Sequence, residues 1–147
     1  MMTDESTVYG YIKKSAESDE QSNYLHHSVN RQAIKSLPSM DYSALIHQEH
    51  FSIPHIYHYD EMSTSSVIHF ASVCRGVEYE WNTWIAEFET LLQKMYWHQV
   101  VVHLETELSG LHTFTWQSDN EVHVPNQSSL EVRCEWQHEL GISARCV

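Results

Sequence analysis

The densest group of potential metal ligands in this chain lies between residues 47 and 61. Zinc binds histidine, cysteine and carboxylate side chains, and closely spaced histidines can chelate one ion. The group consists of His47, His50, His55, His58, Asp60 and Glu61. Residues three apart on a strand point to opposite faces, which would separate His55 from His58, and no H-E-x-x-H or C-x-x-C motif accompanies them. We therefore interpret the histidine-rich segment 47–58 as ordinary histidines and predict no metal and no cofactor.

A second group with potential chemistry is His103, Glu105 and Glu107, which alternate with apolar residues in the run 100–107. Alternation of this kind predicts a strand with these three side chains on one face. A histidine beside a carboxylate can perform general acid–base catalysis, so a small hydrolase or isomerase is one interpretation. A solvated strand face explains the pattern equally well. The chain has no G-x-S-x-G motif, phosphate-binding glycine loop or dinucleotide fingerprint, and we predict no catalytic residue.

The segment from Gly76 to Trp116 positions this second group, because it predicts an amphipathic helix followed at once by a β-hairpin. Seven apolar residues recur at helical spacing and form one stripe: Trp81, Trp84, Ile85, Phe88, Leu91, Leu92 and Met95. The helix is expected to run to about Tyr96, and the hairpin strands to span 97–107 and 111–117 around a turn at 109–110. We expect the helical stripe to face the core.

The remaining elements complete an α+β order. Strands are expected at 7–13, 51–59, 66–74 and 130–137, and a helix at 28–37 that Ser28 caps. The order predicts an antiparallel sheet with two helices packed on one face, a ferredoxin-like βαββαβ arrangement extended by C-terminal strands. We expect a single domain over 1–147, with 1–6 and 139–147 frayed or irregular.

The charge balance excludes one class of partner and favours another. Twenty acidic residues face eight basic ones, a net charge of −12, and the basic residues are scattered. Direct nucleic-acid binding needs a basic patch, so we do not expect it. An acidic surface suits a basic protein partner, although acidity also serves solubility.

The expected cellular location is inferred from features that the sequence lacks. No run approaches the roughly 18 apolar residues of a membrane span, and the first residues do not resemble a secretory signal. The cysteines Cys74, Cys134 and Cys146 are odd in number and contain no C-x-x-C pair, which argues for a reducing compartment. We expect a cytoplasmic protein that contacts no membrane.

Candidate partner-binding residues follow from the predicted faces. If Leu111 faces the core, then His112, Phe114 and Trp116 share the other face, and aromatic side chains beside carboxylates are typical of interface hot spots. Glutamates also line the polar side of the predicted helix. The candidate set is Glu80, Glu87, His103, Glu105, Glu107, His112 and Trp116.

The segment 67–116, above all VEYEWNTWIAEFETLLQKMYW and VVVHLETELSGLHTFTW, resembles a family of small uncharacterised bacterial cytosolic proteins. The N-terminal YGYI and the Leu37–Pro38 segment are also similar. Such proteins are associated with immunity partners of polymorphic or contact-dependent toxins. The resemblance implies a non-enzymatic immunity protein that occludes the active site of a basic toxin domain, such as a nuclease. A homo-oligomeric structural subunit that pairs through its edge strands stays an alternative beside the hydrolase or isomerase.

Overall fold

A computed structural model describes residues 5–15, 20–39, 45–52, 66–107, 110–118, 122–126 and 130–136. The elements, in chain order, are β1 (Glu5–Lys14), α1 (Glu20–Lys35), β2 (Phe51–Ser52), β3 (Ser66–Arg75), α2 (Trp81–Leu92), β4 (Gln99–Thr106), β5 (Gly110–Ser118) and β6 (Leu130–Trp136). Short 3₁₀ helices precede β2 at Gln48–His50 and α2 at Val77–Glu80.

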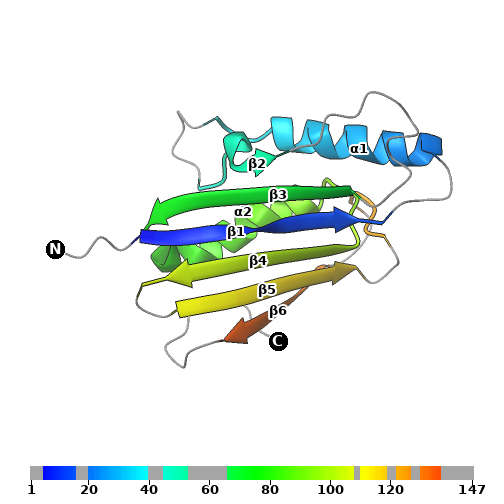
Figure 1. The fold of residues 1–147 in the computed structure, drawn as a ribbon. Coiled ribbons are helices and arrows are strands. Elements are labelled where there is room, and N and C mark those ends of the chain that lie inside the picture. Colours follow the sequence, from blue (N-terminus) through cyan, green and yellow to red (C-terminus); the bar gives the residue numbers. More distant parts are fainter. Residues whose placement is uncertain are drawn as a thin grey trace.

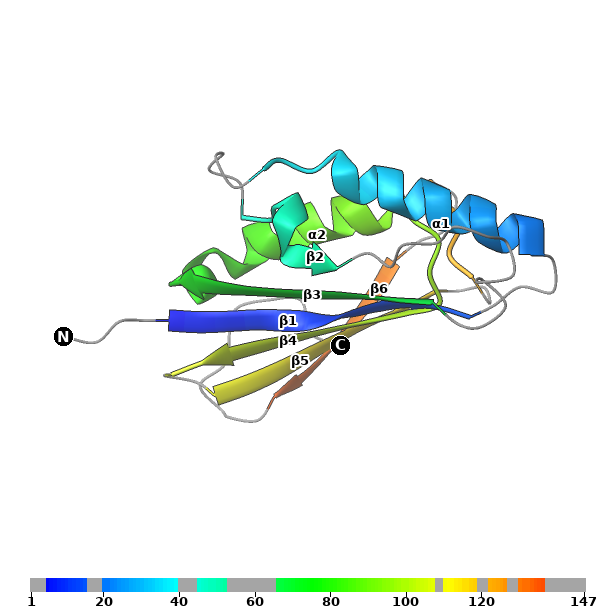
Figure 2. The same ribbon diagram turned by 45° about the horizontal axis from the view of Figure 1, so that its top comes forward.

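The strands form one sheet in the order β2-β3-β1-β4-β5-β6, and every neighbouring pair is antiparallel (Figure 1). β2 contributes only two residues at one edge, whereas the other strands are seven to ten residues long. Both helices lie on the same face of this sheet, and neither covers the opposite face (Figure 2). The predicted α+β class, with an antiparallel sheet and two helices on one face, is therefore confirmed.

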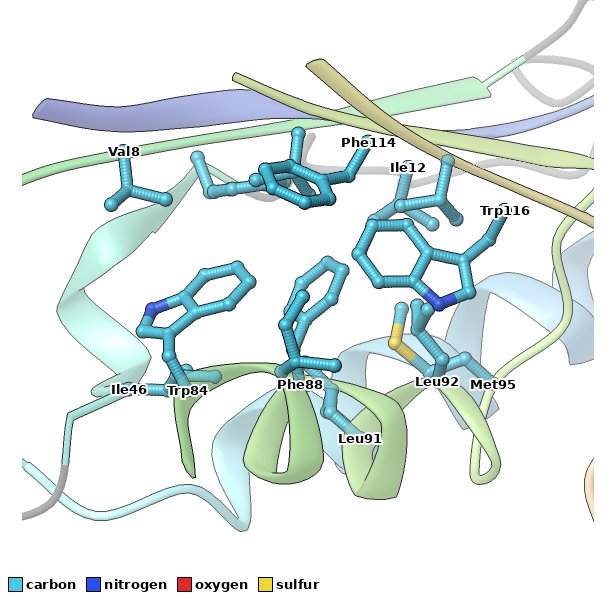
Figure 3. Close-up of a cluster of buried hydrophobic side chains, with 14 of the residues drawn as sticks. Val8, Ile12, Ile46, Trp84, Phe88, Leu91, Leu92, Met95, Phe114 and Trp116 are labelled. Atoms are coloured by element: carbon cyan, nitrogen blue, oxygen red, sulfur yellow. The ribbon is translucent and has the colours of Figure 1, made fainter. Parts of the chain in front are cut away.

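The core lies between α2 and the covered face of the sheet (Figure 3). Trp84 stacks on Phe88 with ring centroids 4.8 Å apart, and Phe88 meets the edge of Trp116 at 5.2 Å. The predicted apolar stripe of the helix is buried throughout, at Trp81, Trp84, Ile85, Phe88, Leu91, Leu92 and Met95. Helical periodicity therefore correctly identified the residues that α2 and the turn after it contribute to the core.

The first helix differs from its prediction. α1 begins at Glu20, eight residues before the expected start, so Ser28 lies inside the helix and does not cap it. The buried side chains of its first half are polar, Asn23 and His27, and hydrophobic periodicity does not detect a polar buried face.

Other boundaries also shift. β1 begins at Glu5 rather than at residue 7, and Ser6 is buried, so the fraying expected up to residue 6 is wrong for these two residues. α2 ends at Leu92, earlier than expected. Most of the expected strand 51–59, residue 109 of the predicted turn and the C-terminal segment from 137 onward lie outside the described residues.

Candidate functional site

One face of the sheet is covered by neither α1 nor α2, and we call it the open face (Figure 2). The less buried side chains of β1, β3, β4 and β5 lie on this face. Strand pairing places residues of its middle side by side in two rows. These rows are Ala71, Tyr9, His103 and Thr113, and next to them His69, Tyr11, Val101 and Thr115. Apart from the two histidines, which are counted as neutral at pH 7, neither row contains an ionisable residue that is charged at this pH. The open face therefore offers a polar, partly aromatic middle without formal charge.

His103 lies in this middle, as the alternation of β4 predicted. Its Nδ1 is 3.0 Å from the hydroxyl of Thr113, and its ring centroid is 5.0 Å from that of Tyr9. Because a hydroxyl can donate or accept, the contact with Thr113 fits either neutral tautomer. The hydrolase or isomerase alternative needs a histidine that is hydrogen-bonded to a carboxylate, whereas the hydrogen bond described for His103 goes to Thr113.

Carboxylates gather where β1 begins and β4 ends, and we call this group the acidic end. Ser6 pairs with Thr106 of β4, and its hydroxyl donates to Glu78 Oε2 at 2.6 Å, which brings the 3₁₀ helix 77–80 to the same end of the sheet. Arg75, opposite Glu5, contributes a positive charge there. The acidic end consists of Glu5, Glu78, Glu80, Glu105 and Glu107.

Two large apolar side chains are exposed beside these carboxylates. Val73 on β3 is 68% exposed and Tyr79 in the 3₁₀ helix is 71% exposed. Val73 pairs with Thr7, whose other neighbour is Glu105, so all three share one row of the open face. The acidic end thus combines negative charge with accessible apolar surface.

His112 and Trp116 do not belong to any exposed surface, which corrects their prediction as partner-binding residues. Both are fully buried on the covered face, together with Phe114, while Leu111, Thr113 and Thr115 face outward. Trp116 donates from Nε1 to Glu89 Oε2 at 2.9 Å and lies against α2 (Figure 3). The physical reason is area, because burying two aromatic rings on the core side removes more apolar surface from water than burying threonines.

The structure also separates the glutamates of the candidate set. Glu80, Glu105 and Glu107 are exposed at the acidic end. Glu87 is half-buried on α2, in the helix layer on the other side of the sheet from Glu105. The candidate residues therefore do not form one contiguous surface.

The histidine-rich segment is described only in part. The rings of His47 and His50 are stacked with centroids 5.0 Å apart, and the other members of the predicted group lie outside the described residues. Burial lowers the pKa of His50, the neighbouring His47 lowers it further, and Glu49 partly opposes both effects. Within the described ranges no three histidine, cysteine or carboxylate side chains are arranged to hold a metal ion.

Sequence reasoning missed a group of buried polar residues where α1 meets the sheet. Lys14 is only 3% exposed, and its Nζ donates to Asn23 Oδ1 at 3.3 Å. The side-chain Nδ2 of Asn30 donates to the backbone carbonyl of Tyr96 at 2.8 Å, and its Oδ1 accepts a hydrogen bond from the backbone N–H of Tyr96 at 2.7 Å. The spacing of Asn23, His27 and Asn30, four and three residues apart, is the signal that could have revealed this polar helical face.

No family model, curated protein or solved structure matches this chain. In the part of the chain that the structure describes, no helix has the length and hydropathy to cross a membrane. The class that the fold and surface define is an α+β protein with one open sheet face and an acidic end.

Proposed function

We propose that the protein is a non-enzymatic immunity protein, which neutralises a toxin domain with a basic surface by occluding its active site. The observation that carries this proposal is the acidic end, where carboxylates of β1, β4 and the 3₁₀ helix lie at the same end of the sheet as the exposed side chains of Val73 and Tyr79. Exposed apolar area supplies binding free energy, and the carboxylates supply orientation and rapid encounter.

Occlusion follows from charge complementarity. A nuclease groove that binds phosphates is lined with lysine and arginine, and carboxylates spaced along a strand end can occupy the positions of successive phosphates. Glu105 and Glu107 lie at the end of β4, and Tyr79, between Glu78 and Glu80 in the 3₁₀ helix, adds an exposed aromatic side chain at the same end of the sheet. The neutral middle of the open face extends the contact area without like-charge repulsion.

The arrangement of the strands supports a finer fold proposal. Without β5 and β6, the remaining strands have the order β4-β1-β3-β2, with α1 following β1 and α2 following β3. Two split βαβ units that pair in this order are typical of the ferredoxin-like arrangement. We therefore propose a ferredoxin-like sheet that β5 and β6 extend beyond β4.

A cytoplasmic location accompanies the immunity proposal, because such a protein meets its toxin inside the cell that makes it.

The test begins with the genomic neighbourhood. The C-terminal domain of a secreted protein encoded directly upstream would be expressed with and without this chain, and growth and complex formation would be measured. Rescue of growth together with a stoichiometric complex is the expected result. A domain that stays toxic when this protein is abundant, and that does not bind it, would contradict the proposal.

Charge reversal then locates the surface. Changing Glu105→Lys with Glu107→Lys should lower the association rate at low salt by about tenfold or more, because electrostatic steering accelerates encounter. The matched control, Glu49→Lys with Glu87→Lys, changes the net charge equally on exposed and half-buried residues away from the acidic end. Equal effects of the two pairs would indicate net charge rather than a specific surface.

A further inference from the structure

The two edges of the sheet differ in length (Figure 1). One edge is formed by the two residues of β2, whereas the other is formed by β6, which contains seven. In the part of the chain that the structure describes, β6 pairs only with β5, so no described strand pairs with its outer backbone N–H and C=O groups. Proteins commonly protect a sheet edge with proline, with lysine or with a very short strand, because an open edge is a template for pairing with another chain. β6 has none of these three features.

The pairing with β5 determines which residues of β6 belong to each face of the sheet, because directly paired residues of antiparallel strands share a face. Three positions pair with the buried residues of β5 and belong to the covered face: Val132, Cys134 and Trp136. The positions that alternate with them belong to the open face: Glu131, Arg133 and Glu135. β6 therefore combines an apolar row with a row in which one positive residue stands between two negative ones.

The charged row restricts how β6 could pair with a second copy of itself. Two copies of an edge strand join in antiparallel orientation about a twofold axis perpendicular to the sheet, which keeps equal faces on the same side. With Arg133 on the axis, arginine would stand opposite arginine and glutamate opposite glutamate, and like charges directly opposite are destabilising. With Cys134 on the axis, Arg133 stands opposite Glu135 of the second copy, and the symmetry repeats this pair.

The same register also matches the apolar row. Trp136 stands opposite Val132 of the second copy, again twice, and an aromatic residue opposite a β-branched one is a favourable cross-strand pair. A shift in the other direction, with Val132 on the axis, would place Arg133 opposite Glu131 but would leave Trp136 beyond the paired residues of β6. The register with Cys134 on the axis is therefore the one that satisfies charge and apolar pairing together.

We propose that the protein forms a homodimer in which two β6 strands pair in this register and join two sheets into one. The occupant of the edge is a second copy because the order glutamate, arginine, glutamate complements itself when the strand is reversed. The dimer does not depend on the proposed toxin partner, since β5 separates β6 from the carboxylates of β1 and β4 at the acidic end. Each copy carries a net charge of −12, and salt of about 0.15 M, with a Debye length of about 8 Å, screens the long-range repulsion between them.

Analytical ultracentrifugation of the full chain, in about 0.15 M salt with a reducing agent, tests whether the dimer exists. The expected result is a species of twice the 17.2 kDa of one chain, whose fraction rises with protein concentration. A single species of 17.2 kDa at every concentration up to the solubility limit would overturn the proposal.

Charge exchange tests the register. Arg133→Glu places glutamate opposite glutamate twice and should raise the dissociation constant of the dimer about tenfold or more. Adding Glu135→Arg exchanges the two charges and should restore the wild-type value. Arg75→Glu, at an exposed position on β3, is the matched control with the same change in net charge and should have no effect. Rescue by Glu131→Arg instead of Glu135→Arg, or equal weakening by Arg75→Glu, would overturn the proposed pairing.

Cysteine cross-linking tests the axis without altering the fold. Directly opposite residues of antiparallel strands have Cα atoms about 4.5–5.5 Å apart, within the roughly 4.4–6.8 Å that a disulfide spans. Diamide, a two-electron oxidant that takes up the two thiol hydrogens, should therefore join Cys134 of the two copies, and mass spectrometry would identify the linked peptide. Cys134→Ser should abolish this covalent dimer, whereas Cys74→Ser should leave it. Covalent dimers linked only through Cys74 or Cys146 would contradict the pairing of β6 with β6.

Discussion

Replacing Trp116 with phenylalanine distinguishes a core residue from a binding residue. The side chain is fully buried on β5, contacts Phe88 and donates to Glu89. Trp116→Phe removes the donor to a charged acceptor, a bond worth about 1.5–3 kcal/mol, of which we take the lower end because Glu89 is half-buried and water can replace the donor. The lost ring area and the cavity add about 1–2 kcal/mol.

The expected destabilisation is therefore about 2–4 kcal/mol, a large part of the roughly 5–15 kcal/mol typical of a folded domain. Urea unfolding followed by far-ultraviolet circular dichroism would measure it, because the other tryptophans complicate fluorescence. The midpoint should fall while the slope with urea stays constant. A double-mutant cycle with Glu89→Gln should give a coupling of about 1 kcal/mol between the two side chains.

Opposite outcomes are expected if Trp116 is an exposed binding residue. Surface substitutions usually change stability by less than about 0.5 kcal/mol. A change that small on Trp116→Phe, accompanied by loss of binding to a partner, would refute the burial argument and restore the prediction from the sequence.

Three further substitutions test the backbone packing at two glycines and the pH dependence of stability. Gly10→Ala should destabilise by more than about 3 kcal/mol, because an added Cβ would lie 1.9 Å from the backbone oxygen of Val101 and β1 would have to move away from β4. Gly76→Ala, at a φ of 69°, should lower the free energy of unfolding by only about 1–2 kcal/mol. If urea unfolding shows Gly76→Ala to be more destabilising than Gly10→Ala, the close approach of β1 and β4 at Gly10 is wrong. Because burial, and then the neighbouring His47, lower the pKa of His50, stability from this site is present above about pH 6.5 and lost as the pH falls. His50→Asn should therefore reduce the difference between urea midpoints at pH 7.5 and 5.5, and an unchanged difference would show that His50 does not contribute to it.

The sequence predicted the elements whose burial is apolar and periodic. The α2 stripe and the alternation of Val100, Val102 and Leu104 on β4 both reached the core as expected. Hydrophobic patterns succeed here because each element has one strongly apolar face and one polar face. β5 was harder, because Leu111 and the threonines on one face and the aromatic residues on the other both allow burial.

The buried polar residues where α1 meets the sheet could not be predicted from such patterns. Asn23 and His27 are polar residues that usually face solvent, and only the contacts with Lys14 and the connection before β4 make their burial favourable. These partners lie on other elements, so no local window of sequence contains the information. The same limitation explains why α1 was predicted to start at Ser28, near the first apolar residues of its buried face.

The geometry also narrows the surface that a partner could use. Residues on α2 and on the open face lie on opposite sides of a sheet, so a single rigid partner cannot contact Glu87 and Glu105 through one flat surface. Gly76, at a φ of 69°, turns the chain after β3 into the 3₁₀ helix 77–80, which places Glu78 and Glu80 at the end of the sheet where β4 also ends. Since Ser6 also ties Glu78 to this end through a hydrogen bond of 2.6 Å, several carboxylates are held on packed elements rather than on a free loop. Carboxylates held in this way lose little conformational entropy on binding, which is the property a tight stoichiometric inhibitor needs.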